Sequence, residues 1–130
     1  MSRISYISGS YVPHDKAFIH IEDRGNQFAD GVYEVIPVNF SSLIDLDLHL
    51  DRLENNLKTL SINFKYNRRI LNFILKRLIF LNKISDGIIY IQISRGVAKR
   101  EHALKKNIKP TIFITARNNK FNFKILEEGV

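Results

Sequence analysis

The chain has 130 residues, of which 45% are hydrophobic, and this size suits one globular domain with a core of its own. It contains no cysteine, which excludes disulfides and thiolate metal sites and fits a reducing compartment. The sequence shows neither the roughly 18 consecutive apolar residues of a membrane-spanning helix nor the apolar run of a secretory signal. We therefore expect a cytoplasmic protein without a membrane partner.

The formal net charge is +7, which permits binding to nucleic acid, membranes or anionic metabolites. The lysines and arginines are spread along the chain, with only small local clusters. The sequence lacks both the aromatic-and-basic strand motif of RNA-binding sheets and a recognition-helix signature. We therefore expect no nucleic-acid partner.

The first third of the chain predicts short strands. Residues 4–7 and 11–13 flank a glycine-containing turn, and residues 18–21 form a third short apolar run. Residues 32–40 alternate as a longer strand, one face of which carries Val32, Glu34, Ile36 and Val38. Pro37 removes a backbone donor, so we expect this strand to lie at an edge or to carry a bulge.

Two helices follow. The first is predicted over residues 47–60, with Asp47 as N-cap and an apolar stripe of leucines at spacings of three and four, namely Leu50, Leu53, Leu57 and Leu60. The second is predicted over residues 67–82. It is apolar around most of its circumference, so we expect it to be covered on more than one side.

The last third predicts two strands, over residues 88–94 and 111–116, joined by a basic loop. After residue 117 the pattern dissolves into what resembles a linker. The order of strands, helix pair and strands predicts an α+β fold. We expect a two-layer sandwich in which the helix pair covers one face of a mostly antiparallel sheet.

The most informative stretch is residues 22–35, where five ionisable side chains stand among two glycines and a tyrosine just before a predicted strand. Gly25 and Gly31 suggest a loop with a demanding backbone shape. Tyr33, placed directly after this loop, could offer its hydroxyl to a ligand. The alternative is an ordinary turn before a strand.

Three cationic or hydrogen-bonding side chains are candidates for anion binding. Arg100 and His102 are two residues apart, so in extended backbone they project to the same side and could clamp a carboxylate. The alternative is a solvated basic loop. Arg52 lies between leucines on the first helix and could hold a phosphate through two hydrogen bonds. The alternative is a surface arginine that pairs with its neighbours.

Other chemistries lack their motifs. The chain has no Gly-x-Ser-x-Gly elbow, no Gly-x-Gly-x-x-Gly loop and no Walker loop. None of its histidines stands at close helical spacing with another, so we expect no metal site.

In order and spacing, several short motifs together resemble the N-terminal part of the pyridoxal-phosphate (PLP)-dependent class IV aminotransferases, most closely the D-amino-acid (D-alanine) aminotransferases. This group also contains the branched-chain aminotransferases. The resemblance covers essentially the whole chain. The motifs are Glu22-Asp23-Arg24-Gly25, Asp30-Gly31-Val32-Tyr33-Glu34-Val35, His49-Leu50-Asp51-Arg52-Leu53, Ser94-Arg95-Gly96, and Arg100 with His102.

The resemblance implies a role for each candidate residue. Arg52 matches the arginine that holds the PLP phosphate. Tyr33, Arg100 and His102 match the group that binds the substrate carboxylate, in which the last two come from across a dimer interface. This pair favours D-amino acids and 2-oxo acids as substrates over those of the branched-chain enzymes or the related lyase. Apolar side chains meant for the rest of such an enzyme would be left exposed here and would drive association, so we expect a homo-oligomer, namely a dimer.

The sequence departs from the family pattern in three places. Ala29 stands where a glycine is usual, Pro37 replaces a residue able to donate to the sheet, and Asn39-Phe40-Ser41 replaces a typical Tyr-Asn-Gly hairpin. These departures bring into question the strand register after Tyr33.

The family carries its Schiff-base lysine in a second, larger domain, and the resemblance implies that no lysine of this chain matches it. We therefore expect residues 1–117 to be the N-terminal domain and residues 118–130 to begin a linker to a large cofactor domain, so that the sequence is truncated relative to the family. The chain alone would hold no catalytic residue, bind no PLP covalently and be inactive. The alternative is a non-catalytic relic or interaction module derived from such an enzyme.

Overall fold

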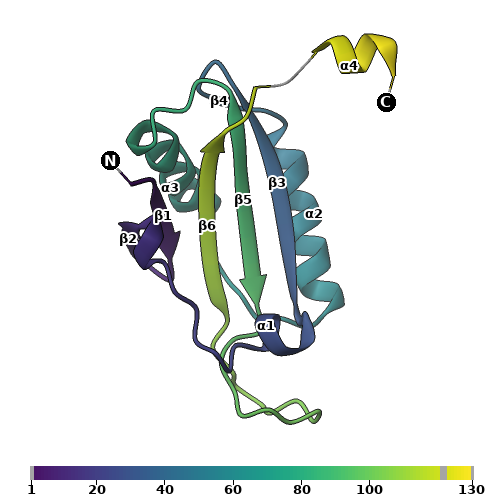
Figure 1. Cartoon of the computed structure of the whole chain (residues 1–130). Helices are drawn as coiled ribbons and strands as arrows, with labels where there is room; N and C mark the ends of the chain where they lie inside the picture. The colour runs from purple at the N-terminus through teal and green to yellow at the C-terminus, as the bar shows by residue number, and fades with distance from the viewer. Residues whose placement is uncertain (1, 121–122, 130) are drawn as a thin grey trace.

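The computed structural model describes residues 2–120 and 123–129. They form one six-stranded sheet with a pair of long helices on one of its faces (Figure 1). The strands are β1 (Ile4–Ile7), β2 (Ser10–Pro13), β3 (Gly31–Asn39), β4 (Ser42–Leu43), β5 (Gly87–Ser94) and β6 (Thr111–Asn118). The helices are α1 (Arg24–Phe28), α2 (Leu46–Thr59), α3 (Arg68–Leu81) and α4 (Phe123–Glu128), and a 3-10 turn covers His14–Lys16.

The sheet has the order β2-β1-β6-β5-β3-β4, and its paired strands are antiparallel. Alternate side chains of β5 point towards the helices, so Ile89, Ile91 and Ile93 are fully buried. They share one core with the leucine stripes of α2 and α3, namely Leu50, Leu53, Leu57, Leu71, Leu75 and Leu78. The predicted two-layer α+β fold is confirmed.

β3 keeps an unbroken register with β5, from Gly31 opposite Ser94 to Val38 opposite Gly87. The carbonyl of Pro37 accepts a hydrogen bond from Ile44 N at 3.0 Å, on the side away from β5. The backbone N and C=O of one residue in an antiparallel strand face the same neighbour. The missing donor of Pro37 therefore lies on the outer side of β3, where β4 pairs over only two residues. β3 is therefore the last strand but one and not the edge of the sheet, with only the two-residue β4 outside it. The unusual residues do not shift its register with β5.

Some predicted elements differ. Residues 18–21 form no strand, and Phe18 and Ile21 are 78% and 76% exposed. Both sides of the adjacent β1 are already paired, with β2 and β6, so this run has no strand edge to join there. Asp47 is not an N-cap: α2 begins at Leu46 after Asp45, whose φ of 50° leaves its side chain without a capping bond.

α3 begins as predicted, because the Asn67 side chain accepts from Arg69 N at 2.8 Å. One side of this helix is not covered, since Ile70, Phe73 and Phe80 are 61–77% exposed. Residue 117 does not end the regular structure: β6 continues to Asn118, and α4 occupies part of the segment expected to be a linker. The domain boundary there stays a prediction. Within the described ranges, no helix has the length and apolar character needed to cross a membrane.

Candidate functional site

The site is built on a buried carboxylate. Glu34 points from β3 into the core face between Val32 and Ile36 and is 1% exposed. Its oxygen Oε1 accepts from Arg52 Nε at 2.7 Å, and Oε2 accepts from Arg52 Nη2 at 2.8 Å. Oε2 also lies 2.7 Å from Nδ1 of His49, one helical turn before Arg52 on α2. Two neighbouring groups of one helix face thus hold a single carboxylate.

These contacts determine the ionisation of Glu34. Burial disfavours the charged form, but the hydrogen bonds from Arg52 and His49 outweigh it and hold the pKa of the carboxyl below its ordinary value. The same bonds raise the pKa of Arg52, which stays a permanent cation. An ionised Glu34 therefore fixes the plane and direction of the Arg52 guanidinium.

Arg52 has hydrogen-bond donors to spare. A guanidinium carries five N–H groups, and Glu34 takes one from Nε and one from Nη2. The Arg52 side chain is 64% exposed. It lines a cleft of about 490 Å³ together with Tyr33, Glu34 and Asn56 along the outer side of β3. Arg52 and Tyr33, which the sequence predicted to act together, therefore share one cleft.

Tyr33 stands on the opposite face of β3 from Glu34. Its side chain is 61% exposed, and its ring stacks on Tyr90 of β5 at 5.7 Å between centroids. Tyr90 in turn lies 5.8 Å from Phe113 of β6. A row of aromatic rings thus crosses three strands on the face without helices, and Tyr33 is its outermost member.

Gly25 in α1 and Gly31 at the start of β3 are needed for close packing and not for unusual torsion angles, because neither has a positive φ. A Cβ on Gly25 would stand 2.8 Å from the Cβ of Ser94, and one on Gly31 would stand 2.8 Å from the carbonyl oxygen of Ile93. The residue with the demanding torsion is Ala29, which ends α1 with a φ of 53°. The segment predicted as a loop contains the short helix α1.

Arg100 and His102 lie together, but not in the cleft of Tyr33 and Arg52. Both flank the ring of Phe28 in α1: the Arg100 guanidinium carbon is 5.2 Å from its centroid, and the His102 ring centre is 5.5 Å away. Both side chains are exposed. The backbone of this basic loop is bonded to α1, because Nη1 of Arg24 donates to the Glu101 carbonyl at 2.8 Å.

A second carboxylate organises the same end of the sheet. Asp30 accepts from Arg24 Nε at 2.8 Å and from Arg95 Nε and Nη2 at 2.7 and 3.0 Å. Burial alone would raise the pKa of Asp30, but the two arginines lower it below the ordinary value. Arg95 also donates to the Leu60 carbonyl at 2.8 Å, so this cluster joins β3, β5 and the end of α2.

Comparisons with known proteins decide the family. A model of the amino-transferase class IV family matches residues 31–124. The chain belongs to this family. It is 35% identical over 105 residues to a D-alanine aminotransferase of Bacillus licheniformis, which is 81% of this chain and 37% of that protein. It is 31% identical over 126 residues to the Staphylococcus haemolyticus D-alanine aminotransferase, covering 96% of this chain and 45% of that protein.

Solved structures of two other proteins share the fold. The branched-chain amino acid aminotransferase of Escherichia coli superposes with a TM-score of 0.84 at 16% identity, over 91% of this chain and 41% of that one. The 4-amino-4-deoxychorismate lyase of Pseudomonas aeruginosa gives 0.79 at 22% identity, over 97% of this chain and 44% of that one. The chain thus spans less than half the length of these relatives and solved structures, and it is a class IV aminotransferase N-terminal domain.

Sequence reasoning missed Glu34 and His49 as the supports of Arg52 in this class IV domain. The signal was present, because Glu34 is the one charged residue on an otherwise aliphatic strand face. A carboxylate placed there must find cationic partners. No comparable pattern in the sequence indicated that Arg100 and His102 would contact the ring of Phe28.

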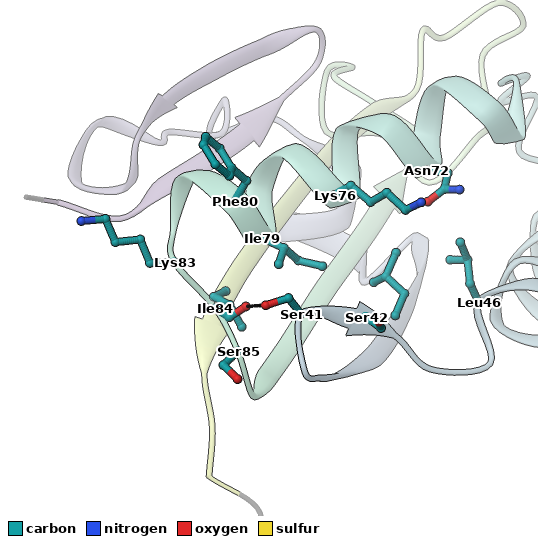
Figure 2. A pocket seen from close by; sticks show the side chains of 11 residues that line it. Ser41, Ser42, Leu46, Asn72, Lys76, Ile79, Phe80, Lys83, Ile84 and Ser85 are labelled. Atoms are coloured by element: carbon teal, nitrogen blue, oxygen red, sulfur yellow. Dashed lines mark hydrogen bonds between the residues drawn. The ribbon is translucent and has the colours of Figure 1, made fainter.

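A larger cavity than the Tyr33–Arg52 cleft lies elsewhere in this class IV domain, between the β3–β4 hairpin and α3 (Figure 2). It measures about 850 Å³ and has apolar walls that include Leu46, Ile79 and Ile84, with Lys76 and Lys83 also lining it. It contains none of the predicted site residues. Within residues 2–120 and 123–129, no group of three or more potential metal ligands is present.

Proposed function

We propose that this chain is the N-terminal part of a PLP-dependent transaminase that moves amino groups between D-amino acids and 2-oxo acids. The observation that carries this proposal is the Arg52 guanidinium, fixed by buried Glu34 at 2.7 and 2.8 Å and exposed in one cleft with Tyr33. Such a fork suits a phosphate, since its free N–H groups can bind two oxygens at once.

The residues present fit one part of the cofactor. Arg52 would hold the PLP phosphate, and the Tyr33 hydroxyl would bind the substrate carboxylate beside it. When bound, PLP supplies the electron-accepting ring on which amino-group transfer depends. The chain's own contribution would be to bind the phosphate and to orient the guanidinium that holds it. Glu34, which is itself bonded to His49, fixes Arg52 before any ligand arrives.

The lysine that bonds the cofactor is proposed to come from outside these 130 residues. A lysine becomes nucleophilic near neutral pH when it is desolvated or lies next to another cation. Every lysine side chain that the structure describes is exposed. This supports the expectation that the chain alone does not transaminate.

Arg100 and His102 are proposed to complete the carboxylate site of a second copy of the chain. Within one copy they lie against Phe28 and line no part of the Tyr33–Arg52 cleft. Their exposed cationic and hydrogen-bonding groups are available to a neighbour across a homodimer interface. The preference for D-amino acids rests on this pair and on the D-alanine aminotransferase relatives.

The phosphate role is tested by titrating the chain with pyridoxamine 5′-phosphate, which has the phosphate but no aldehyde to react with surface lysines. Pyridoxamine serves as the matched ligand without phosphate. We expect Arg52→Lys to weaken binding of the phosphorylated ligand about tenfold or more, because lysine cannot form the two-point contact. The control Arg69→Lys changes an exposed arginine and should leave binding unchanged.

Equal affinity for the two ligands, or unchanged affinity in Arg52→Lys, would contradict the assignment of the phosphate site. A separate assay mixes the chain with PLP, D-alanine and 2-oxoglutarate. We expect no turnover, and turnover that depends on PLP would refute the proposal that the lysine lies elsewhere.

A further inference from the structure

Gln92 lies directly opposite Tyr33 on the face of the sheet that points away from α2 and α3. The two residues are register partners of the neighbouring strands β3 and β5 (Figure 1). Residues directly opposite each other in an antiparallel pair have Cβ atoms about 4.5–5.5 Å apart on the same face. A ligand that the Tyr33 hydroxyl binds on this face is therefore close to the Gln92 side chain as well.

The orientation of the Gln92 amide is fixed by a neighbouring tyrosine. The hydroxyl of Tyr90 donates to Gln92 Oε1 at 2.8 Å. Tyr90 is itself held on both sides, because its ring centre lies 5.7 Å from that of Tyr33 and 5.8 Å from that of Phe113. With its oxygen engaged in this way, the amide presents its nitrogen, which carries two N–H donors.

The amide nitrogen of Gln92 is accessible. In the described part of the chain, the bond to Tyr90 uses Oε1 and no hydrogen bond uses Nε2. Buried polar atoms without a partner do occur nearby, at Asp23 Oδ2 and Ser94 Oγ, but Gln92 Nε2 is not one of them. A nitrogen that has no protein partner and is not buried remains open to solvent and to a ligand.

A hollow beside the amide is kept open by glycine. It measures about 250 Å³, and Gln92, Tyr33 and Gly25 are among the residues that line it. A Cβ on Gly25 would stand only 3.4 Å from Gln92 Nε2. The hollow adjoins the Tyr33–Arg52 cleft, because Gly31, Val32 and Tyr33 line both. The donor therefore faces a space that is continuous with the proposed substrate site.

The polar side chains of this hollow are both neutral donors. Its lining residues include no ionisable acid or base, and their polar side-chain groups are the Tyr33 hydroxyl and the Gln92 amide. Each can donate to an oxygen, and a carboxylate has two oxygens with about four acceptor positions. One carboxylate can thus accept from both residues at once.

We propose that Gln92 is a second binding residue for the substrate carboxylate: its Nε2 donates to one oxygen while the Tyr33 hydroxyl donates to the other. This inference rests on the proposed function, which assigns the carboxylate to Tyr33. It adds a donor from the same copy of the chain, whereas Arg100 and His102 are proposed to come from a second copy. Because Tyr90 already holds the amide, little binding energy is spent on ordering it.

The test compares two ligands that differ by the carboxylate. N-(5′-phosphopyridoxyl)-D-alanine is a stable amine that carries both the phosphate and the carboxylate of D-alanine, and pyridoxamine 5′-phosphate carries only the phosphate. We expect the chain to bind the alanine adduct about tenfold more tightly, which is the size of effect that hydrogen bonds to a charged group produce.

Two variants isolate the amide. Gln92→Met removes it and should lower the affinity for the alanine adduct about tenfold, with the affinity for pyridoxamine 5′-phosphate unchanged. Gln92→Glu keeps the size and the acceptor for the Tyr90 hydroxyl but exchanges the N–H donors for a negative charge, so the preference for the adduct should disappear. If Gln92 served only to accept from Tyr90, Gln92→Glu would behave like the wild type.

The control Asn118→Asp makes the same amide-to-carboxylate change at an exposed residue. Asn118 is the register partner of Gly87, at the other end of β5 from Gln92. It should keep the wild-type preference for the alanine adduct. Circular dichroism checks that each variant is folded, and Gln92→Glu decides if Gln92→Met is not.

The assignment of Gln92 fails if its folded variants keep the wild-type preference while Arg52→Lys weakens both ligands. If Arg52→Lys has no effect, or if neither ligand binds, the phosphate site has failed and a titration with sodium pyruvate decides about Gln92. The side-chain NH₂ signal of Gln92, identified by its loss in Gln92→Met, should then shift saturably with pyruvate and not with sodium chloride. Equal responses to the two salts would overturn the assignment.

Discussion

Glu34 and Arg52 form a two-point ion pair across the interface between β3 and α2, with Nε–Oε1 and Nη2–Oε2 distances of 2.7 and 2.8 Å. The carboxylate is buried and the arginine is 64% exposed. The pair therefore links β3 to α2 through a buried carboxylate, while the guanidinium of Arg52 faces solvent. A residue proposed to bind a ligand is thus also part of the fold.

Replacing Glu34 by Gln is expected to lower the free energy of unfolding by about 2 kcal/mol. Hydrogen bonds to a charged group contribute about 1.5–3 kcal/mol. The loss is not larger because Arg52 is exposed, so water can solvate its charge once the carboxylate is gone. Urea unfolding at neutral pH measures this. The exposed control Asp47→Asn should cost about 0.5 kcal/mol or less. Equal losses in the two variants would show that the pair does not stabilise the domain.

The contribution of Glu34 also depends on pH. Its pKa is lower in the folded chain than the unfolded value of about 4.3. The stabilisation is therefore fully present above the unfolded pKa and is lost as the pH falls through the folded pKa. The difference in unfolding free energy between the wild type and Glu34→Gln should shrink between pH 5.5 and pH 3. A difference that stays constant over this range would be inconsistent with the lowered pKa.

Ala29→Gly is expected to stabilise the chain by about 1 kcal/mol, because Ala29 has a φ of 53° and a left-handed conformation costs a residue with a Cβ about 1–2 kcal/mol. Ala29 is exposed, so the change removes little packing. Thermal unfolding measures the gain. Ala103→Gly, at an exposed position without a positive φ, should bring no gain. A lower melting temperature for Ala29→Gly would refute the strain assigned to this position.

The β3–β4 hairpin turns through Phe40 and Ser41, whose φ values are 47° and 59°. Such a turn favours Asn-Gly, because both central residues have a positive φ. Phe40→Asn should therefore stabilise the chain by about 0.5–1 kcal/mol, all the more since Phe40 is 83% exposed. Phe18→Asn is the control, with an equally exposed phenylalanine that lacks a positive φ.

Thermal unfolding of Phe40→Asn and Phe18→Asn in parallel provides the comparison. A gain confined to Phe40→Asn supports strain in the turn, whereas an equal change in both variants would point to a general effect of surface polarity. Ser41→Gly is a weaker test, because it also removes the hydrogen bond from Ser41 Oγ to the Ile84 carbonyl at 2.9 Å.

The elements that sequence reasoning predicted are those whose signal is local. Alternation along β3 and β5 predicted their buried faces, and the apolar periodicity of residues 67–82 predicted α3. The run at residues 18–21 misled because an apolar alternation cannot show whether a sheet edge is free to accept another strand. The prediction of Asp47 as the N-cap was wrong because α2 begins one residue earlier, after Asp45. Asp45 adopts a left-handed conformation that could not be read from the sequence.

For the site, the sequence placed Tyr33 and Arg52 correctly in relation to each other, since they share a cleft. It could not show that Arg100 and His102 lie against Phe28, because the two segments are far apart along the chain. It also left Glu34 without a role, although a charge among aliphatic neighbours required one. The local pattern shows that Glu34 needs a cationic partner, but which distant residue supplies it is a property of the folded chain.

The hydrogen bond from Arg24 to the Glu101 carbonyl has a consequence for how the basic loop meets a ligand. Arg24 also donates to Asp30, which directly precedes β3. The backbone of Glu101, between Arg100 and His102, is therefore linked to this end of the sheet. Folding has already restricted this stretch of backbone. If the loop binds a carboxylate as proposed, the ligand needs to order only these two side chains, and less of its binding energy is spent on the main chain.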